Sequence, residues 1–138
     1  MEHIQTSIVT ETPVDVAKLQ AERPDAVVFN GYANQYDART LTAKVGERVR
    51  IWVLDAGPDR ATTSFHVVGG QFDTVYKEGA YLLRQSDGGA SQALDLVPAQ
   101  GGFVELSFPQ AGHYPFVSHV VVDAERGAHG VVEVRAGP

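Results

Sequence analysis

Short stretches in which apolar and polar residues alternate recur along most of this chain. In residues 48–54, the apolar residues Val49, Ile51 and Val53 occupy every second position, which places them on one face of an extended strand. Residues 103–108 alternate in the same way. This two-residue period predicts strands that have one buried face and one solvent-exposed face.

Turn-forming residues separate these stretches, since the chain contains 14 Gly and 7 Pro. About eight strands are predicted between the turns, at residues 27–29, 48–54, 64–68, 74–76, 92–97, 103–108, 114–118 and 131–134. Strands in close succession favour a β-sandwich or small barrel over a fold of alternating strands and helices. A single helical turn is predicted within residues 124–130, before the last strand.

The N-terminal part has a different pattern. The first twelve residues are mostly polar and predict a loose arm. Proline is favoured at the first position of a helix and disfavours helix in the residue before it, so Pro13 and Pro24 predict a short helix or arm between them. We therefore expect an N-terminal arm or linker over residues 1–25 and one all-β domain over residues 26–138.

Composition narrows the classes of function. The 138 residues, of which 43% are hydrophobic, suffice for one domain with one core. No run of 18 apolar residues predicts a membrane span, and the N-terminus has no apolar stretch typical of a secretory signal. The net charge is −6 and the 11 Lys and Arg residues are scattered, which argues against a nucleic-acid partner.

The chain has no cysteine, which excludes disulfides, cysteine-ligated zinc, iron–sulfur clusters, thiol catalysis and a thiolate-ligated copper site. Motifs of serine hydrolases, phosphate-binding loops and dinucleotide-binding folds are also absent from the sequence. Asp73 and Asp95 lie in strand-like segments, but nothing in the sequence pairs them for acid–base chemistry. The histidines therefore carry most of the candidate chemistry.

Five histidines fall into two groups. We expect His3 in the arm to be inert, His113 in a turn to be solvated, and His129 to be packed or partly exposed. His66 and His119 instead lie within apolar, strand-like segments, where a histidine is either a hydrogen-bonded core residue or part of a site. Two histidines do not complete a metal site of three or four ligands, so further ligands would come from elsewhere, including another chain.

Several segments of the chain match a known family in their order. They are VFNG (28–31), LTAKVGERVR (41–50), SFHVVG (64–69), FDTVY (72–76), VPAQGG (97–102), and SH (118–119) followed by RGAHG (126–130). In this order they resemble the second cupredoxin domain of copper-containing nitrite reductases and of related bacterial multicopper oxidases. The resemblance covers residues 26–135, and residues 14–24 resemble the linker that joins the two domains in that family.

The resemblance implies a Greek-key β-sandwich of the cupredoxin type. It also implies a homotrimer in which a type 2 copper lies between subunits, with nitrite or dioxygen as substrate and a periplasmic or extracellular location. His119 matches the copper ligand that the second domain contributes. His66 matches the catalytic histidine that manages protons beside the metal, and we include it with His119 in the metal site. Val68 matches an apolar residue that lines the substrate pocket.

Departures from the family pattern limit these expectations. Ser118 stands where a type 1 copper domain has its cysteine, so we expect no type 1 copper in this chain. His129 stands where the family is usually aliphatic, and it is either a weak metal contact or a tolerated surface change.

We expect a domain that is inactive alone and needs a homotrimer or a partner cupredoxin domain. The alternatives are a non-catalytic structural or trimerisation module, or a fragment of a two-domain laccase-like oxidase. The second is less favoured, because the sequence has no His-X-His motif.

Overall fold

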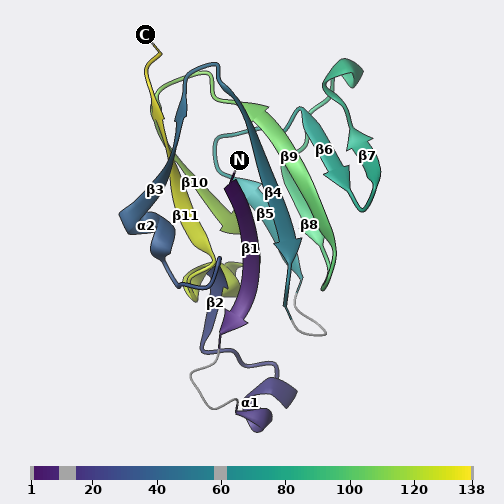
Figure 1. The fold of residues 1–138 in the computed structure, drawn as a ribbon, viewed down its shortest axis with the longest axis vertical. Helices are drawn as coiled ribbons and strands as arrows, with labels where there is room; N and C mark the ends of the chain where they lie inside the picture. The colour runs from purple at the N-terminus through teal and green to yellow at the C-terminus, as the bar shows by residue number, and fades with distance from the viewer. Residues whose placement is uncertain (1, 10–14, 58–61, 138) are drawn as a thin grey trace.

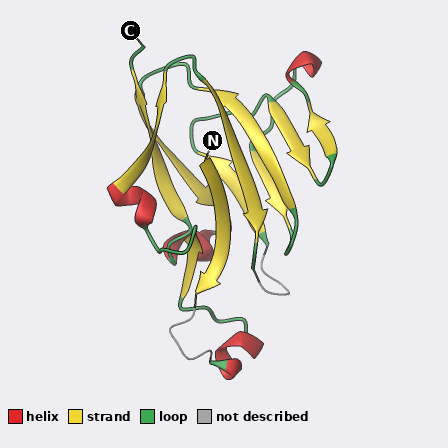
Figure 2. Ribbon diagram, viewed as in Figure 1, coloured by secondary structure: helices red, strands yellow, loops and turns green. Residues whose placement is uncertain are grey.

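The computed structural model describes residues 2–9, 15–57 and 62–137 of the chain. Its strands form two sheets that pack face to face (Figures 1 and 2). This arrangement confirms the β-sandwich expected from the alternating pattern. None of the helices within these residues is long and apolar enough to cross a membrane.

One sheet has six strands in the order β2-β1-β4-β9-β6-β7. Their bounds are β1 Glu2–Val9, β2 Ala26–Phe29, β4 Arg48–Asp55, β6 Thr74–Lys77, β7 Ala80–Leu83 and β9 Gly101–Ser107. The other sheet has five strands in the order β3-β11-β10-β5-β8. Their bounds are β3 Arg39–Lys44, β5 Thr63–Val67, β8 Ala93–Leu96, β10 Gly112–Ser118 and β11 His129–Arg135.

The helices are short and lie between strands. They are α1 Val16–Gln20, α2 Gln35–Ala38, the 3₁₀ turn η1 Gln85–Asp87, and α3 Val121–Glu125. The helix expected between the two prolines is confirmed as α1, where the Asp15 carboxylate accepts a hydrogen bond from the Lys18 backbone N–H at 3.0 Å. The predicted helix start at Pro13 lies outside the described residues. The turn expected within residues 124–130 begins earlier, at Val121.

The expected strands are all present, but the sequence pattern missed β1, β3 and β7. The loose arm is wrong for residues 2–9, since β1 pairs antiparallel with β2 and parallel with β4. Polar segments can form strands because sheet pairing satisfies the backbone N–H and C=O groups whatever the side chains are. The division into residues 1–25 and 26–138 stays a prediction.

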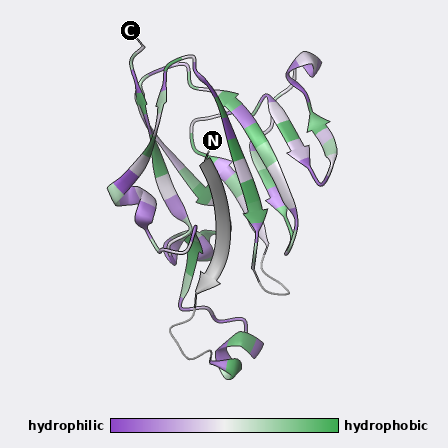
Figure 3. Cartoon of the chain, viewed as in Figure 1, coloured by the Kyte–Doolittle hydropathy of each residue, from purple (hydrophilic) through white to green (hydrophobic). Residues whose placement is uncertain are grey.

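The core lies between the two sheets and is rich in aromatic rings. The rings of Phe29 and Phe116, from opposite sheets, lie 5.5 Å apart, and Phe65 lies 6.2 Å from Phe29. All three side chains are at most 1% exposed. Apolar positions alternate along the strands in Figure 3, as the sequence period predicts. This core fixes β5 and β10, the strands that matter for the candidate site.

The expectation of one wet face on each strand is wrong for β9. Val104 and Leu106 face the core, but Phe103 and Glu105 on the opposite face are also only 4% and 8% exposed. The guanidinium of Arg50 lies 4.3 Å from the centre of the Phe103 ring and covers it. Long arginine side chains can bury such a face because their stems are apolar.

Candidate metal centre

Strands β5 and β10 bring His66 and His119 together. The two strands pair antiparallel, with His66 opposite Val117 and Phe65 opposite Ser118. His119 follows the end of β10, and its backbone N–H donates to the Ser64 carbonyl at 2.7 Å. The two imidazole rings lie 5.5 Å apart between centroids, at an angle of 62°. Two histidines that are 53 positions apart in sequence therefore share one surface.

His66 is half-buried on β5, and a backbone group fixes its ring. Its Nδ1 is hydrogen-bonded to the carbonyl oxygen of Gln92, just before β8. A carbonyl oxygen only accepts hydrogen bonds, so Nδ1 must carry the proton. In the neutral ring the lone pair is then on Nε2, where it can bind a metal or accept a proton. This arrangement suits either role expected of His66.

His119 is exposed at the end of β10, on a backbone that is held from both sides. The Ser118 N–H donates to the Ala128 carbonyl at 3.0 Å. The Ser118 side chain is buried, and its hydroxyl accepts a hydrogen bond from the Thr63 hydroxyl at 3.1 Å. Because successive side chains alternate along a strand, a buried Ser118 directs His119 outward.

Exposed valines adjoin both histidines in the sequence. Val120, Val121 and Val122 directly follow His119, and their exposed fractions are 36%, 61% and 51%. Val68, two positions after His66, is 45% exposed, and its N–H donates to the Pro115 carbonyl. Clustered exposed apolar side chains are typical of interaction surfaces. Exposed apolar side chains therefore follow each of the two histidines in the sequence.

The two histidines do not form a complete metal site by themselves. Among the described residues, no group of three or more His, Asp or Glu side chains is placed to hold a metal ion. The donor chemistry nevertheless fits copper, which binds neutral imidazole well. A copper ion bound at this pair would need further ligands from outside the described residues.

The other histidines lie in different surroundings. His113 is exposed on β10, opposite Glu133 of β11. His129 donates from Nδ1 to the Ala124 carbonyl at 2.7 Å and from Nε2 to the Asp37 carboxylate at 3.0 Å. Both ring nitrogens of His129 are thus engaged within the chain, which favours the tolerated change over the weak metal contact. The side chain of His3, on β1, falls outside the described part.

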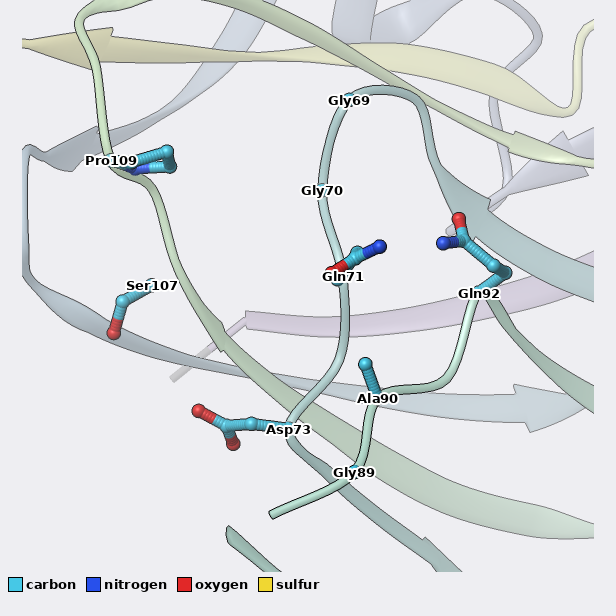
Figure 4. Close-up of a pocket in the computed structure, with 9 residues that line it drawn as sticks. All are labelled: Gly69, Gly70, Gln71, Asp73, Gly89, Ala90, Gln92, Ser107 and Pro109. Carbon is cyan, nitrogen blue, oxygen red and sulfur yellow. The ribbon is translucent and has the colours of Figure 1, made fainter.

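A pocket of about 520 Å³ lies between the loop that follows β5, the segment before β8 and the end of β9 (Figure 4). Gln92, whose carbonyl holds His66, contributes to its wall, but neither histidine nor Val68 lines it. The pocket is lined by Gly69, Gly70, Gln71, Asp73, Gly89, Ala90, Gln92, Ser107 and Pro109. The pocket therefore shares Gln92 with His66 but is lined by neither imidazole.

The carboxylates that the sequence left open have structural partners. Both oxygens of Asp73 accept hydrogen bonds from Arg48, at 2.8 and 2.9 Å. Asp95 pairs with Lys77 at 3.1 Å. Burial acts to raise the pKa of Asp73, but hydrogen bonds from Arg48 and Thr74 outweigh it and hold that pKa below its ordinary value. These carboxylates are ionised partners of cations rather than an acid–base pair.

Comparison with curated proteins identifies homologous copper enzymes, although no protein-family model matches the chain. The copper-containing nitrite reductase of Neisseria gonorrhoeae is 38% identical over 125 residues, covering 88% of this chain and 30% of the relative. The multicopper oxidase mco of Staphylococcus epidermidis is 26% identical over 129 residues, covering 89% of this chain and 28% of the relative. The chain thus spans about 30% of the length of these relatives.

Solved structures give the same result. A copper-containing nitrite reductase from Thermus scotoductus matches with a TM-score of 0.85 and 26% identity, over 96% of this chain and 30% of that one. The copper nitrite reductase from Nitrosomonas europaea matches with a TM-score of 0.83 and 28% identity, over 96% and 48%. These findings confirm the resemblance seen in the sequence. Over the part that they share, the chain is similar in sequence and fold to copper-containing nitrite reductases and multicopper oxidases, and it has their cupredoxin-type β-sandwich.

Proposed function

We propose that this chain supplies His119, with His66 beside it, to a type 2 copper site that is completed by another subunit or domain. The observation that carries this proposal is the pair of imidazole rings 5.5 Å apart, without a third candidate ligand among the described residues. A site with two protein ligands binds copper weakly, whereas three or four ligands are typical of a tight site.

His119 is the proposed copper ligand. It is exposed, and the hydrogen bonds of Ser64, Ser118 and Ala128 hold its backbone, so its ring can meet a metal at a subunit boundary. Holding a ligand in place before the metal arrives lowers the cost of binding. We propose no role at the metal for His3, His113 or His129.

His66 is the proposed proton-managing residue. Bound copper would supply the electron and an open position for nitrite or dioxygen. The Gln92 carbonyl keeps the proton of His66 on Nδ1, so that Nε2 accepts and returns a proton near the substrate. Val68, exposed two positions away, would form an apolar wall of that substrate site.

The partner we propose is a second copy of this chain in a homotrimer, or a partner cupredoxin domain. The exposed Val120, Val121 and Val122 would be covered in such an assembly. The chain has no cysteine and hence no thiolate for a type 1 copper, so electrons would come from a cupredoxin domain that carries such a copper or from a separate donor, not from a second copy of this chain. Alone, the chain would not turn over nitrite. A periplasmic or extracellular location follows from the same proposal.

The test is copper uptake by the wild type, by His119→Ala and by the matched control His113→Ala, each measured by titration calorimetry and Cu(II) EPR. We expect His119→Ala to lose binding and the control to bind like the wild type. Unchanged copper affinity in His119→Ala would falsify the ligand assignment. If the wild type takes up no copper either as a monomer or as an oligomer, the chain is a non-catalytic structural module.

His66 has its own test. We expect His66→Ala to keep copper but to lose proton-coupled turnover when the variant is assembled with its partner domain. Normal turnover at every pH would contradict the proton-managing role. Loss of copper together with turnover would make His66 a ligand instead.

A further inference from the structure

His129 connects three elements that are far apart in the sequence. It lies at the start of β11, its Nδ1–H donates to the Ala124 carbonyl of α3 at 2.7 Å, and its Nε2–H donates to the Asp37 carboxylate of α2 at 3.0 Å. Both acceptors lack a proton to give, because a carbonyl oxygen and an ionised carboxylate only accept. With Asp37 ionised, both bonds form together only when the ring is doubly protonated and positively charged.

Close packing brings α2 to this position. Gly130 follows His129, and a Cβ on Gly130 would lie 2.3 Å from the Cβ of Tyr36. The missing side chain lets Tyr36 pack directly on β11, where Tyr36 and Gly130 form a parallel bridge. The Tyr36 hydroxyl also accepts a hydrogen bond from the Asn30 side-chain amide at 2.6 Å. Asp37, the next residue, is thereby held beside His129.

Helix α3 depends on contacts of this kind. It buries none of its residues, and its N-cap residue Val120 makes no side-chain capping bond. Backbone bonds hold its far end, including Ala128 N–H to the Asp123 carbonyl at 3.0 Å. His129 adds a charged donor to a carbonyl in the last turn, where a positive charge also interacts favourably with the helix dipole. A helix with so little buried surface needs such an anchor.

We propose that charged His129 is a positioning residue that ties α3, with its exposed valines, to α2. When the ring loses one proton, the single N–H that remains goes to the ionised Asp37, the stronger acceptor, and the Nδ1 lone pair then faces the Ala124 carbonyl and releases α3. The role toward the metal depends on the function proposed above. The attachment of α3 does not depend on it and exists in the metal-free protein. α3 starts two positions after His119, so its movement would act on the segment that follows the proposed copper ligand, whose own backbone N–H stays bonded to the Ser64 carbonyl.

The charged and titratable groups on α2, β3, β10, α3 and β11, the elements around His129, are Tyr36, Asp37, Arg39, Lys44, His113, Tyr114, Asp123, Glu125, Glu133 and Arg135, with Arg126 at the end of α3. Among these, Asp37 acts on His129, whereas Asp123 interacts with Arg126 and Asp55. Burial acts to lower the pKa of His129, but the bonds to Ala124 and Asp37 outweigh it and raise that pKa above 6.5. The stabilisation is then complete below pH 6.5 and is lost as the pH rises through the raised pKa.

The first experiment follows the metal-free chain by NMR from pH 5 to 9, which extends from about 1.5 units below to about 2.5 units above an ordinary histidine pKa. We expect the His129 ring to titrate above 6.5 in the wild type and closer to 6.5 in Asp37→Asn. The backbone amides of Val121 and Val122 should titrate with the same midpoint. Asp95→Asn, which changes an exposed carboxylate paired only with Lys77 among the described side chains, is the control and should leave both midpoints unchanged.

Two results would overturn the proposal. One is a His129 midpoint at or below 6.5. The other is a titration in which the backbone amides of Val121 and Val122 do not share the midpoint of the His129 ring. His129→Gln adds a check that does not rely on the ring signal, because glutamine can donate to one acceptor but carries no charge. In this variant the titration of the α3 amides near the His129 midpoint should disappear, and its persistence would contradict the role.

The second experiment separates this inference from the proposed function. Cu(II) affinity is compared between the wild type and His129→Gln at both ends of the same pH range. We expect the variant to bind more weakly at low pH and equally at high pH. The ratio of the two Cu(II) affinities could be the same at both ends of the pH range while the α3 amides titrate with His129. That result would overturn the role of His129 toward the metal. No copper binding by the wild type would end the proposed function, while the NMR result would still decide whether His129 fixes α3.

Discussion

Two regions of the molecule differ in how many of their polar groups have partners within the chain. One is the outer face of the six-stranded sheet, and the other is the histidine end of the five-stranded sheet, where β5 and β10 carry His66 and His119. On the outer face, Glu105 accepts from Arg48 at 2.5 Å and from Arg50 at 2.6 Å, and Asp73 completes the set by pairing with Arg48. At the histidine end, His66 and His119 face each other with coordination capacity left over and with exposed valines nearby.

This contrast separates structural chemistry from functional chemistry. The outer face also has an aromatic group, since Tyr76 stacks on Phe103 at 4.9 Å and Trp52 contacts it at 4.8 Å. Arginines and rings close that surface within one chain. The histidine end is not closed in this way, and a partner that brings ligands and apolar surface would complete it. Substitutions in the two regions should therefore affect different measurements.

The largest loss of stability is expected for Glu105→Ala. This substitution leaves Arg48 and Arg50 without the carboxylate that they share. A hydrogen bond to a charged group contributes about 1.5–3 kcal/mol to the free energy of unfolding. Because both arginines are more than a third exposed, we expect about 2 kcal/mol in denaturant unfolding, with copper uptake unchanged. Asp95→Ala, whose side chain is 84% exposed, is the matched control and should cost less than about 0.5 kcal/mol.

Acid pH should weaken the hydrogen bonds that Glu105 accepts from Arg48 and Arg50. Burial acts to raise the pKa of Glu105, but hydrogen bonds from Arg48 and Arg50 outweigh it, so the pKa lies below 4.5. A lowered pKa in the folded state means that the stabilisation is present above pH 4.5 and is lost as the pH falls through the lowered value. Unfolding midpoints measured from neutral to acid pH should fall less steeply in Glu105→Gln. Equal slopes would show that Glu105 is not the group responsible.

A smaller effect is expected for Ser118→Ala. It removes the buried hydroxyl that pairs with Thr63 at 3.1 Å, at a cost of about 1 kcal/mol. Because Ser118 also precedes His119, we expect weaker copper binding as well. The double variant with Thr63→Val should recover part of the stability, since no hydroxyl is then left unpaired. A double variant less stable than the sum of the single changes would contradict this pairing.

The smallest change in stability is expected for Val121→Asp. Val121 is 61% exposed and α3 buries none of its residues, so the change should stay within about 0.5 kcal/mol. Its effect should instead appear in sedimentation, as weaker self-association in the presence of copper. Val16→Asp, at a similarly exposed valine of α1, is the control. Equal association of the two variants would remove α3 from the proposed interface.

The sequence predicted the parts of the fold that depend on local pattern. Alternation located β4, β5 and β10, because their buried and exposed residues follow a period of two. The same reasoning missed β1, whose residues are mostly polar, and the closed outer face of β9. Phe103 and Glu105 are covered by side chains from β4 and β6, and a contact between distant strands leaves no local signal.

The candidate site was predictable for a different reason. His66 and His119 were singled out by their apolar surroundings and by resemblance, and strand pairing then placed them together. The role of His129 was not predictable, because its partner Asp37 is 92 positions away and depends on the small size of Gly130. Glycine at that position gives no hint of which side chain occupies the space it leaves.

Strand β1 has a practical consequence. It lies between β2 and β4, so it is the element through which the N-terminal strand pair joins the rest of its sheet. A version of the chain trimmed to begin at Ala26 would leave the hydrogen-bonding edge of β4 uncovered, and a bare edge can recruit a strand from another molecule. Shortened versions made for crystallisation or assembly should retain residues 2–9, so that aggregation at this edge is not mistaken for copper-dependent association.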